Sequence, residues 1–134
     1  MTKAPAFAIK AEISNAASQT FAKAKTMYGG KLIQSGDAIF LFDIGKGLVA
    51  KGRVTDSRRT PRNPRLERQT PRISFTVEIE SRATKLLGRT EVKSFTDWKD
   101  GRPETEINFK FYRQSTPKIV GLTSGCAAFL SRHF

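Results

Sequence analysis

Two almost continuous apolar runs, separated by a glycine-rich step, dominate the hydrophobic pattern of this chain. Residues 38–44 (AIFLFDI) are apolar except for Asp43, and residues 48–54 (LVAKGRV) open with three apolar side chains. A strand with water on one side alternates apolar and polar positions, whereas a continuous run is typical of a strand covered on both faces. The Gly-Lys-Gly step at 45–47 supplies a turn, and Gly52 indicates a bulge or bend. The pattern therefore predicts a central hairpin that is buried on both faces.

The rest of the chain shows several alternating patterns and two helix-like ones. Residues 7–13 (FAIKAEI) and 73–81 alternate as half-buried strands do, and residues 107–113 (INFKFYR) alternate again and predict the last strand. Apolar residues at positions 17, 21, 24 and 28 recur at spacings of four, three and four, and with a Ser-Asn cap before them and a glycine pair after them they predict a helix over residues 15–27. Thr123 with its neighbouring serine is expected to cap a short C-terminal helix.

These elements predict a mixed α+β fold that is mainly β. We expect a small curled sheet or β-barrel of about five to six strands, with one helix after the first strand and a short C-terminal helix. The length of 134 residues fits a single domain over 1–134. Because no apolar run approaches the roughly 18 to 20 residues that span a bilayer, and the N-terminus lacks a secretory signal, we expect a soluble, cytoplasmic protein without a membrane partner.

Charge changes this picture most. The chain carries 24 Lys and Arg against 12 Asp and Glu, which gives a formal net charge of +12. A basic excess of this size in a small domain favours a polyanionic partner, and nucleic acid, DNA or RNA, is the usual one. The alternative is charge that serves solubility alone.

Arginine is concentrated in residues 57–72 (SRRTPRNPRLERQTPR), where three prolines and a single apolar residue predict a basic loop. The functional interpretation is an arm that lies along a phosphate backbone, because the guanidinium group suits bidentate phosphate contacts. The alternative is a disordered insertion without a specific role. The candidate phosphate-binding residues are Arg58, Arg59, Arg62, Arg65, Arg68 and Arg72.

Residues suited to catalysis or metal binding are scarce. The only histidine, His133, is the penultimate residue, and chain ends fray. The single cysteine, Cys126, cannot form an internal disulfide and is expected to be a small buried residue. No HExxH, P-loop or GxSxG pattern occurs. The sequence therefore predicts a binding module rather than an enzyme, with no metal site and no cofactor.

Aromatic side chains with polar neighbours are the candidates for stacking on nucleobases. Trp98 stands in a polar turn over residues 98–103, and Tyr112 lies on the less apolar face of the predicted last strand, next to Arg113. The alternative for each is ordinary packing, since a loop tryptophan commonly plugs the end of a core and a strand tyrosine commonly covers an edge.

Together these segments resemble the EVE domain of the PUA-like superfamily. The first strand of that family ends in a Lys-Ser-Glu-like step, which is Lys10-Ala11-Glu12 here, and its hairpin has a Gly-Asp start, which is Gly36-Asp37 here. The return strand GLVAKGRV at 47–54 is similar to the family's Gly-Ile-Val-Gly-x-Gly-x-Val-like pattern, and the closing TPKIVGLTSGCAAFL is similar to its last strand and short helix.

The resemblance implies a PUA-like β-barrel whose pocket accepts a nucleobase, often a modified one flipped out of DNA or RNA. It places Lys10, Ala11 and Glu12 at the edge of that pocket. The chain departs from the family where tryptophans are common near the first strand and helix, because Phe7 and Met27-Tyr28 stand there. The signature of the related ASCH branch is absent.

Our leading hypothesis is a nucleic-acid-binding module that reads a modified or flipped base. Trp98 or Tyr112 would stack on the base, and Lys10, Glu12 and Arg113 would supply hydrogen bonds. Two alternatives remain: a protein-interaction module whose basic loop docks on an acidic partner, and a small nucleotide- or RNA-processing enzyme. The pattern leaves the oligomeric state open.

Overall fold

The computed structural model of the chain describes residues 4–23, 26–60, 72–112 and 118–134. Within them, seven strands form one mixed sheet in the order β2-β6-β5-β4-β1-β7-β3. The strands are β1 (Ala6–Ala11), β2 (Ser18–Lys23), β3 (Thr26–Met27), β4 (Ala38–Asp43), β5 (Gly47–Thr60), β6 (Arg72–Leu87) and β7 (Ile119–Leu122). The helical segments are the 3-10 turn η1 (Gly30–Leu32), α1 (Arg89–Val92), α2 (Pro103–Ile107), the π-helical η2 (Asn108–Tyr112) and α3 (Ser124–Ser131).

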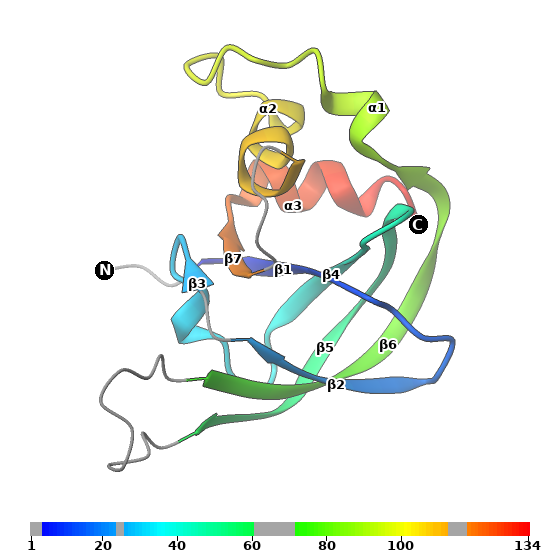
Figure 1. The fold of residues 1–134 in the computed structure, drawn as a ribbon, viewed down its shortest axis with the longest axis vertical. Helices are drawn as coiled ribbons and strands as arrows, with labels where there is room; N and C mark the ends of the chain where they lie inside the picture. The colour runs from blue at the N-terminus through cyan, green and yellow to red at the C-terminus, as the bar shows by residue number, and fades with distance from the viewer. Residues whose placement is uncertain (1–3, 24–25, 61–71, 113–117) are drawn as a thin grey trace.

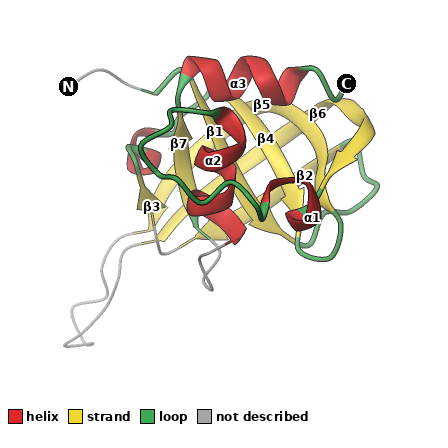
Figure 2. Ribbon diagram, turned by 90° about the horizontal axis from the view of Figure 1, so that it is seen from above, coloured by secondary structure: helices red, strands yellow, loops and turns green. Residues whose placement is uncertain are grey.

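The sheet is curved, and the helices gather over one of its faces. The long strands β5 and β6 bend and carry the sheet round from β4 to β2 (Figure 1), and their pairing shifts register at several points, one of them between Lys51 and Gly52. A side chain at Gly52 would collide with the carbonyl oxygen of Glu78, so the predicted bulge also needs a glycine for the close approach of β6. Seen from above, α1, α2 and α3 lie on the same side of the sheet (Figure 2).

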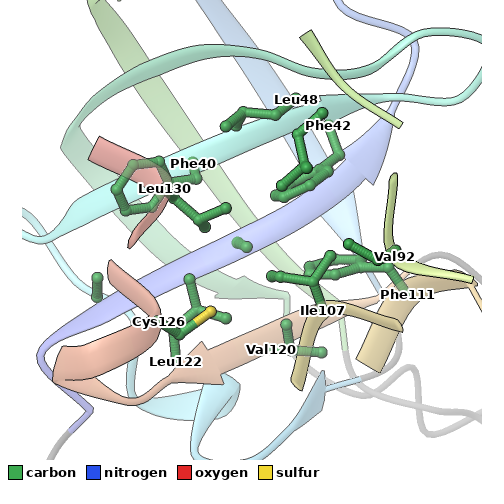
Figure 3. Close-up of a cluster of buried hydrophobic side chains, with 13 residues drawn as sticks. Phe40, Phe42, Leu48, Val92, Ile107, Phe111, Val120, Leu122, Cys126 and Leu130 are labelled. Carbon is green, nitrogen blue, oxygen red and sulfur yellow. The ribbon is translucent and has the colours of Figure 1, made fainter. Parts of the chain in front are cut away.

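Two hydrophobic cores lie on the two faces of the sheet. The first lies between the sheet and the helices, where the Phe42 and Phe111 rings stack at 4.6 Å near Val92 and Ile107, and Leu130 of α3 lies near Phe40 (Figure 3). The second lies on the opposite face and contains residues from six strands, including Phe21 of β2. Phe21 packs on Phe75 of β6 at 5.6 Å between ring centroids.

The central hairpin is confirmed. Alternate side chains of β4 enter the two cores, Phe40 and Phe42 on the helix side and Ile39 and Leu41 on the other. β1 is buried on both faces as well, although its sequence alternates, because Ala8 faces one core while Phe7 and Ile9 face the other. The expectation of a half-buried first strand was therefore wrong.

Several other expectations from the sequence are confirmed. The alternation over 73–81 lies inside β6, with Ile73, Phe75 and Val77 buried. The hydroxyl of Thr123 accepts a 3.2 Å hydrogen bond from the backbone N–H of Cys126 and so caps α3. Cys126 itself is buried in the core beneath the helices.

The helix predicted over 15–27 is wrong. Residues Ser18–Lys23 form β2, an edge strand that pairs antiparallel with β6 from Ser18–Glu78 to Lys23–Ile73, and Thr26–Met27 form β3, which pairs parallel with β7. The pairing gives this segment's backbone its hydrogen bonds, so a weak helix propensity is overridden by tertiary structure. The sheet consequently has more strands than the expected five to six.

The last strand predicted over 107–113 is also wrong. Residues Pro103–Ile107 form α2 and Asn108–Tyr112 continue it as a π-helix, with Ile107 and Phe111 four residues apart and both buried. Residues 89–95 contain the single turn α1 (Arg89–Val92). The basic loop is shorter than residues 57–72, because β5 continues to Thr60 and β6 begins at Arg72; residues 61–71 lie outside the described part of the chain.

Candidate nucleic-acid interface

Three lysines meet at the C-terminal end of β1. The antiparallel register that pairs Ile9 with Ile119 brings Lys10 beside Lys118, the residue before β7. Lys10 Nζ donates a 3.0 Å hydrogen bond to the carbonyl of Phe111 in η2, and Lys23 Nζ of β2 donates to the carbonyl of Lys10 at 3.4 Å. Lys118 Nζ lies 3.1 Å from the sulfur of Met27 in β3. We call Lys10, Lys23, Lys118 and Met27 the lysine site.

The lysine site holds positive charge where water is partly excluded. Lys118 is buried, and Lys10 and Lys23 are half-buried. Burial, together with the neighbouring charge of Lys118, lowers the pKa of Lys10, and burial lowers the pKa of Lys23. Both shifts mean that the fold raises the free energy of the charged ammonium groups. A bound anion would relieve that cost, so the arrangement suits a phosphate or the acceptor edge of a base.

The other two residues of the Lys-Ala-Glu step lie at the same strand end but differ in exposure. Ala11 is buried in the core of the face opposite the helices, and Glu12 is exposed beyond the strand. The carbonyl of Glu12 accepts a 2.9 Å hydrogen bond from the side-chain amide of Gln19, and Asp43 accepts one from the backbone N–H of Ile13. These bonds fix the direction in which the chain leaves β1.

Trp98 lines a separate open cavity of about 640 Å³. Its side chain is 71% exposed, and Lys99 Nζ lies 5.1 Å from the centroid of its ring. The lining combines three aromatic residues with charged and small ones from the turn after β3, the 94–102 segment, α2, η2 and the residue that follows β7: Tyr28, Trp98, Gly101, Arg102, Thr105, Glu106, Phe109, Lys110 and Thr123. We call this space the tryptophan cavity. The described lining of this cavity does not include Lys10. Lys10 and Trp98, which were predicted to contribute to one pocket, therefore lie at two different places.

A buried ion pair lines the tryptophan cavity. Lys110 Nζ donates to Glu106 Oε2 at 2.9 Å and to the carbonyl of Gly121 at 2.6 Å. The carboxylate of Glu106 also accepts bonds from the hydroxyl of Thr123 at 2.6 Å and from its backbone N–H at 3.1 Å. Burial opposes the ionised form of Glu106, but the bonds from Thr123 and Lys110 together outweigh it and hold the pKa of that carboxyl below its usual value. The pair ties α2 and η2 to β7.

Tyr112 is not placed to stack on a base in this structure. It lies in η2 rather than on a strand, its hydroxyl donates a 3.0 Å hydrogen bond to the carbonyl of Leu87, and its ring meets the edge of Phe42 at 6.4 Å. Burial, with a smaller effect from Glu91, raises its pKa. Arg113, its predicted partner, lies outside the described residues.

Half of the candidate phosphate-binding arginines lie on regular strands. Arg58 and Arg59 are exposed near the end of β5, and Arg72 is exposed at the start of β6, opposite Thr60. Arg58 pairs with Asp56 at 3.2 Å, and Arg59 donates a 3.0 Å bond to the carbonyl of Lys31. Arg62, Arg65 and Arg68 lie outside the described residues.

Sequence reasoning missed several residues that the structure brings to the two sites. Lys23 falls within the helix that was predicted over residues 15–27, and Lys118 and Lys110 carried no signal in a single sequence. The step Met27-Tyr28 did carry a signal in the sequence, because it occupies the region where tryptophans are common in EVE domains. Met27 lies in the lysine site, and Tyr28 lines the tryptophan cavity.

Two further observations concern the described residues only. No three His, Cys, Asp or Glu side chains among them come close enough to hold a metal ion. No helix in this part of the chain has the length and apolar character needed to cross a membrane.

No family model matches the chain, and no curated protein matches it in sequence. Solved structures match it over nearly its whole length. The DUF55 domain of human thymocyte nuclear protein 1 has a TM-score of 0.61 at 14% identity, over 96% of this chain and 98% of that one. The human THYN1 protein in complex with 5-methylcytosine-containing DNA has a TM-score of 0.64 at 15% identity, over 95% and 96%.

A bacterial structure gives the same result. Rpa0253 from Rhodopseudomonas palustris, solved by NMR, has a TM-score of 0.59 at 13% identity, over 96% of this chain and 92% of that one. DUF55 domains are EVE domains of the PUA-like type. The resemblance read from the Lys-Ala-Glu step, the glycine-rich return strand and the closing segment is therefore confirmed at the level of the fold: the chain shares the fold of these domains.

Proposed function

We propose that the chain is a nucleic-acid-binding module that recognises a modified base, with the lysine site at the edge of the base pocket. The observation that carries the proposal is the convergence of Lys10, Lys23 and Lys118 at the C-terminal end of β1. Like charges brought together in a partly dry site repel one another, and a bound anion would reduce that repulsion. Nucleic acid supplies such anions, and the net charge of +12 favours it as a partner.

The fold supports the choice of a modified base. The human THYN1 protein, whose fold this chain shares, was solved in complex with DNA that contains 5-methylcytosine. In this proposal the ammonium groups of Lys10 and Lys118 bind the flipped nucleotide through its phosphate and acceptor edge, and the sulfur of Met27 contacts the base. Arg58, Arg59 and Arg72, at the far end of β5 and β6, bind phosphates along the strand. The module binds and has no catalytic step.

The test is a binding titration by fluorescence anisotropy. Labelled oligonucleotides of one sequence carry cytosine, 5-methylcytosine or N6-methyladenine at one position, single-stranded and duplex, at 50 and 200 mM salt. We expect tighter binding to one modified base and a loss of affinity at the higher salt, because phosphate contacts release counterions. Equal affinity for all three oligonucleotides would remove the modified base from the proposal, and affinity that does not change with salt would remove the phosphate contacts.

A matched pair of variants tests the place of binding. Lys10→Met and Lys46→Met change the charge equally, but Lys46 lies exposed in the turn between β4 and β5. We expect Lys10→Met to weaken binding about tenfold, as the loss of a hydrogen bond from a charged group does, and Lys46→Met to have little effect. Equal effects would show that the lysine site is not the binding site. Capture of an acidic peptide in place of every oligonucleotide would favour the protein-interaction alternative.

A further inference from the structure

The lysine site and the tryptophan cavity lie side by side, joined by two consecutive residues. Met27 contacts Lys118 in the first, and Tyr28 lines the second, so their Cα atoms are about 3.8 Å apart. The same order holds along β7: Lys118, just before the strand, belongs to the lysine site, and the carbonyl of Gly121 within it accepts a bond from Lys110, which lines the cavity. This closeness is what the binding of consecutive nucleotides at the two places would require.

The backbone at Tyr28 is held in an uncommon conformation that presents its ring to the cavity. Its φ is 54°, a region that a bulky side chain seldom adopts. The turn is pressed against β7 so closely that a side chain at Gly121 would collide with the carbonyl of Tyr28. Backbone strain of this kind persists only where surrounding contacts impose it, and it is concentrated at ligand-binding sites. Tyr28 as a whole is nevertheless 51% exposed.

The charges around the cavity favour an anionic ligand with a flat aromatic part. Tyr28, Trp98 and Phe109 offer ring faces or edges, and Arg102 and Lys110 are cationic. Glu106 is the carboxylate in the lining, and bonds from Lys110 and Thr123 already occupy it. A cationic ligand such as a methylated lysine would meet Arg102, while the carboxylate in the described lining, Glu106, is already paired with Lys110. A nucleotide presents a stacking base together with a phosphate, which matches both features.

We propose that the tryptophan cavity is a second nucleotide subsite, in which the base next to the recognised one stacks on Trp98 and Tyr28; this rests on the function proposed above. The recognised base occupies the lysine site, and its neighbour enters the cavity while Arg102 approaches the phosphate. Stacking on an aromatic face tolerates any base, so this subsite adds affinity for single-stranded or unpaired nucleic acid without adding sequence preference.

Trp98 is the only tryptophan in the chain, so its fluorescence reports on this cavity alone. The experiment uses short single-stranded oligonucleotides with one 5-methylcytosine, flanked either by bases or by abasic sites. Anisotropy of a labelled oligonucleotide measures binding, and tryptophan emission measures stacking. We expect the flanked oligonucleotide to bind roughly 5- to 150-fold more tightly than the abasic one and to change the emission of Trp98 at saturation.

Two variants complete the test. Trp98→Ala is expected to remove most of the preference for a flanking base, and Trp98→Phe to retain part of it. Leu86→Ala is the matched control, because Leu86 is a similarly exposed apolar residue that does not line this cavity. Binding that leaves the emission unchanged, or an abasic penalty that persists in Trp98→Ala, overturns the second subsite while leaving the proposed function intact. Absence of binding to every oligonucleotide at low salt overturns both.

Discussion

Lys110 places its ammonium group 4.3 Å from the centroid of the Tyr28 ring while it donates hydrogen bonds to Glu106 and to the carbonyl of Gly121. One cation thus joins η2, α2, β7 and the turn after β3. A cation over an aromatic face is attracted to it, and the attraction grows as water is excluded. The position of the Tyr28 ring, and with it the shape of the tryptophan cavity, therefore depends on this lysine.

Replacement of Lys110 should lower the free energy of unfolding more than replacement of an exposed lysine does. In Lys110→Met the carboxylate of Glu106 keeps its bonds to Thr123 but loses its cation in a site where both side chains are largely buried. Leaving a buried charge unpaired costs about 2 to 4 kcal/mol. Urea unfolding measures the change, with Lys93→Met, an exposed lysine, as the control. A loss within about 0.5 kcal/mol of the control would contradict the structural role given to this ion pair.

Acid should weaken the fold through Glu106. Its pKa in the folded protein lies below the usual value, so the stabilisation is present above about pH 4.5 and is lost as the pH falls through the lowered value. The pKa of exposed Asp100 is also lowered, chiefly by the backbone N–H of Arg102, so Glu106 accounts for part of the effect. Glu106→Gln should flatten the fall in unfolding free energy between pH 5 and 3. Parallel pH curves for the variant and the original chain would contradict this assignment.

Secondary structure could be predicted where the apolar run was almost continuous. It could not be predicted where a few spaced apolar residues fitted both the period of a strand and the period of a helix. The runs within β4 and β5 are almost continuous, short and separated by a glycine-rich turn, and together these features favour strands buried on both faces. In residues 107–111 the apolar residues fit both alternation and an i, i+4 helical pair, and the buried pair Ile107 and Phe111 shows that the helix prevails. In β2 only Phe21 is buried, so its pairing with β6, rather than its own pattern, determines the strand.

Only those residues of the candidate site that their sequence neighbours mark could be predicted; the residues that the fold brings to them could not. The Lys-Ala-Glu step and the exposed Trp98 were identified from the sequence, and both lie at hollowed or charged places in the structure. Lys10 and Phe111 are 101 positions apart, and the register of β1 with β7 that adds Lys118 is a property of the folded sheet. Tyr112 was misplaced because the strand on which it was expected does not form.

The close approach of Tyr28 to β7 should make Gly121 intolerant of a side chain. The Cβ of an alanine would collide with the Tyr28 carbonyl and lie 2.9 Å from the Cβ of Ala4. Gly121→Ala should therefore lower the unfolding free energy by about 1 to 3 kcal/mol, as overpacking does. Gly125→Ala in α3 is the control, because nothing lies within 4 Å of its added Cβ and alanine favours the helix by up to about 1 kcal/mol. Thermal denaturation of both variants tests this prediction, and equal changes in their melting temperatures would contradict the close packing.

As the pH rises, nucleic-acid binding should begin to weaken at a lower pH than it would if only exposed lysines bound the nucleic acid. Burial and the charge of Lys118 lower the pKa of Lys10 in the free protein, so its ammonium loses its proton at a lower pH than an exposed lysine does. Affinity should fall as the pH rises from 7 towards 10, and Lys10→Met should remove that part of the fall. An oligonucleotide of cytosine and adenine avoids titration of the bases themselves. A fall in affinity identical in the variant would show that another group titrates.

Substitutions at two arginines should distinguish an arginine that contacts phosphate from one that stabilises the fold. Arg58 is exposed on β5 with Asp56 as its neighbour, whereas Arg82 of β6 donates to the carbonyls of Ser14 and Ala16 at 3.0 and 2.9 Å. Arg58→Gln should leave the unfolding free energy nearly unchanged and reduce the slope of log affinity against log salt by about one, as the loss of one phosphate contact does. Arg82→Gln should instead cost about 1 kcal/mol of stability, because the segment between β1 and β2 loses its bonds, and should keep the slope. Equal slopes for both variants and the original chain would exclude Arg58 as a phosphate contact and restrict the nucleic-acid surface to the lysine site and its surroundings.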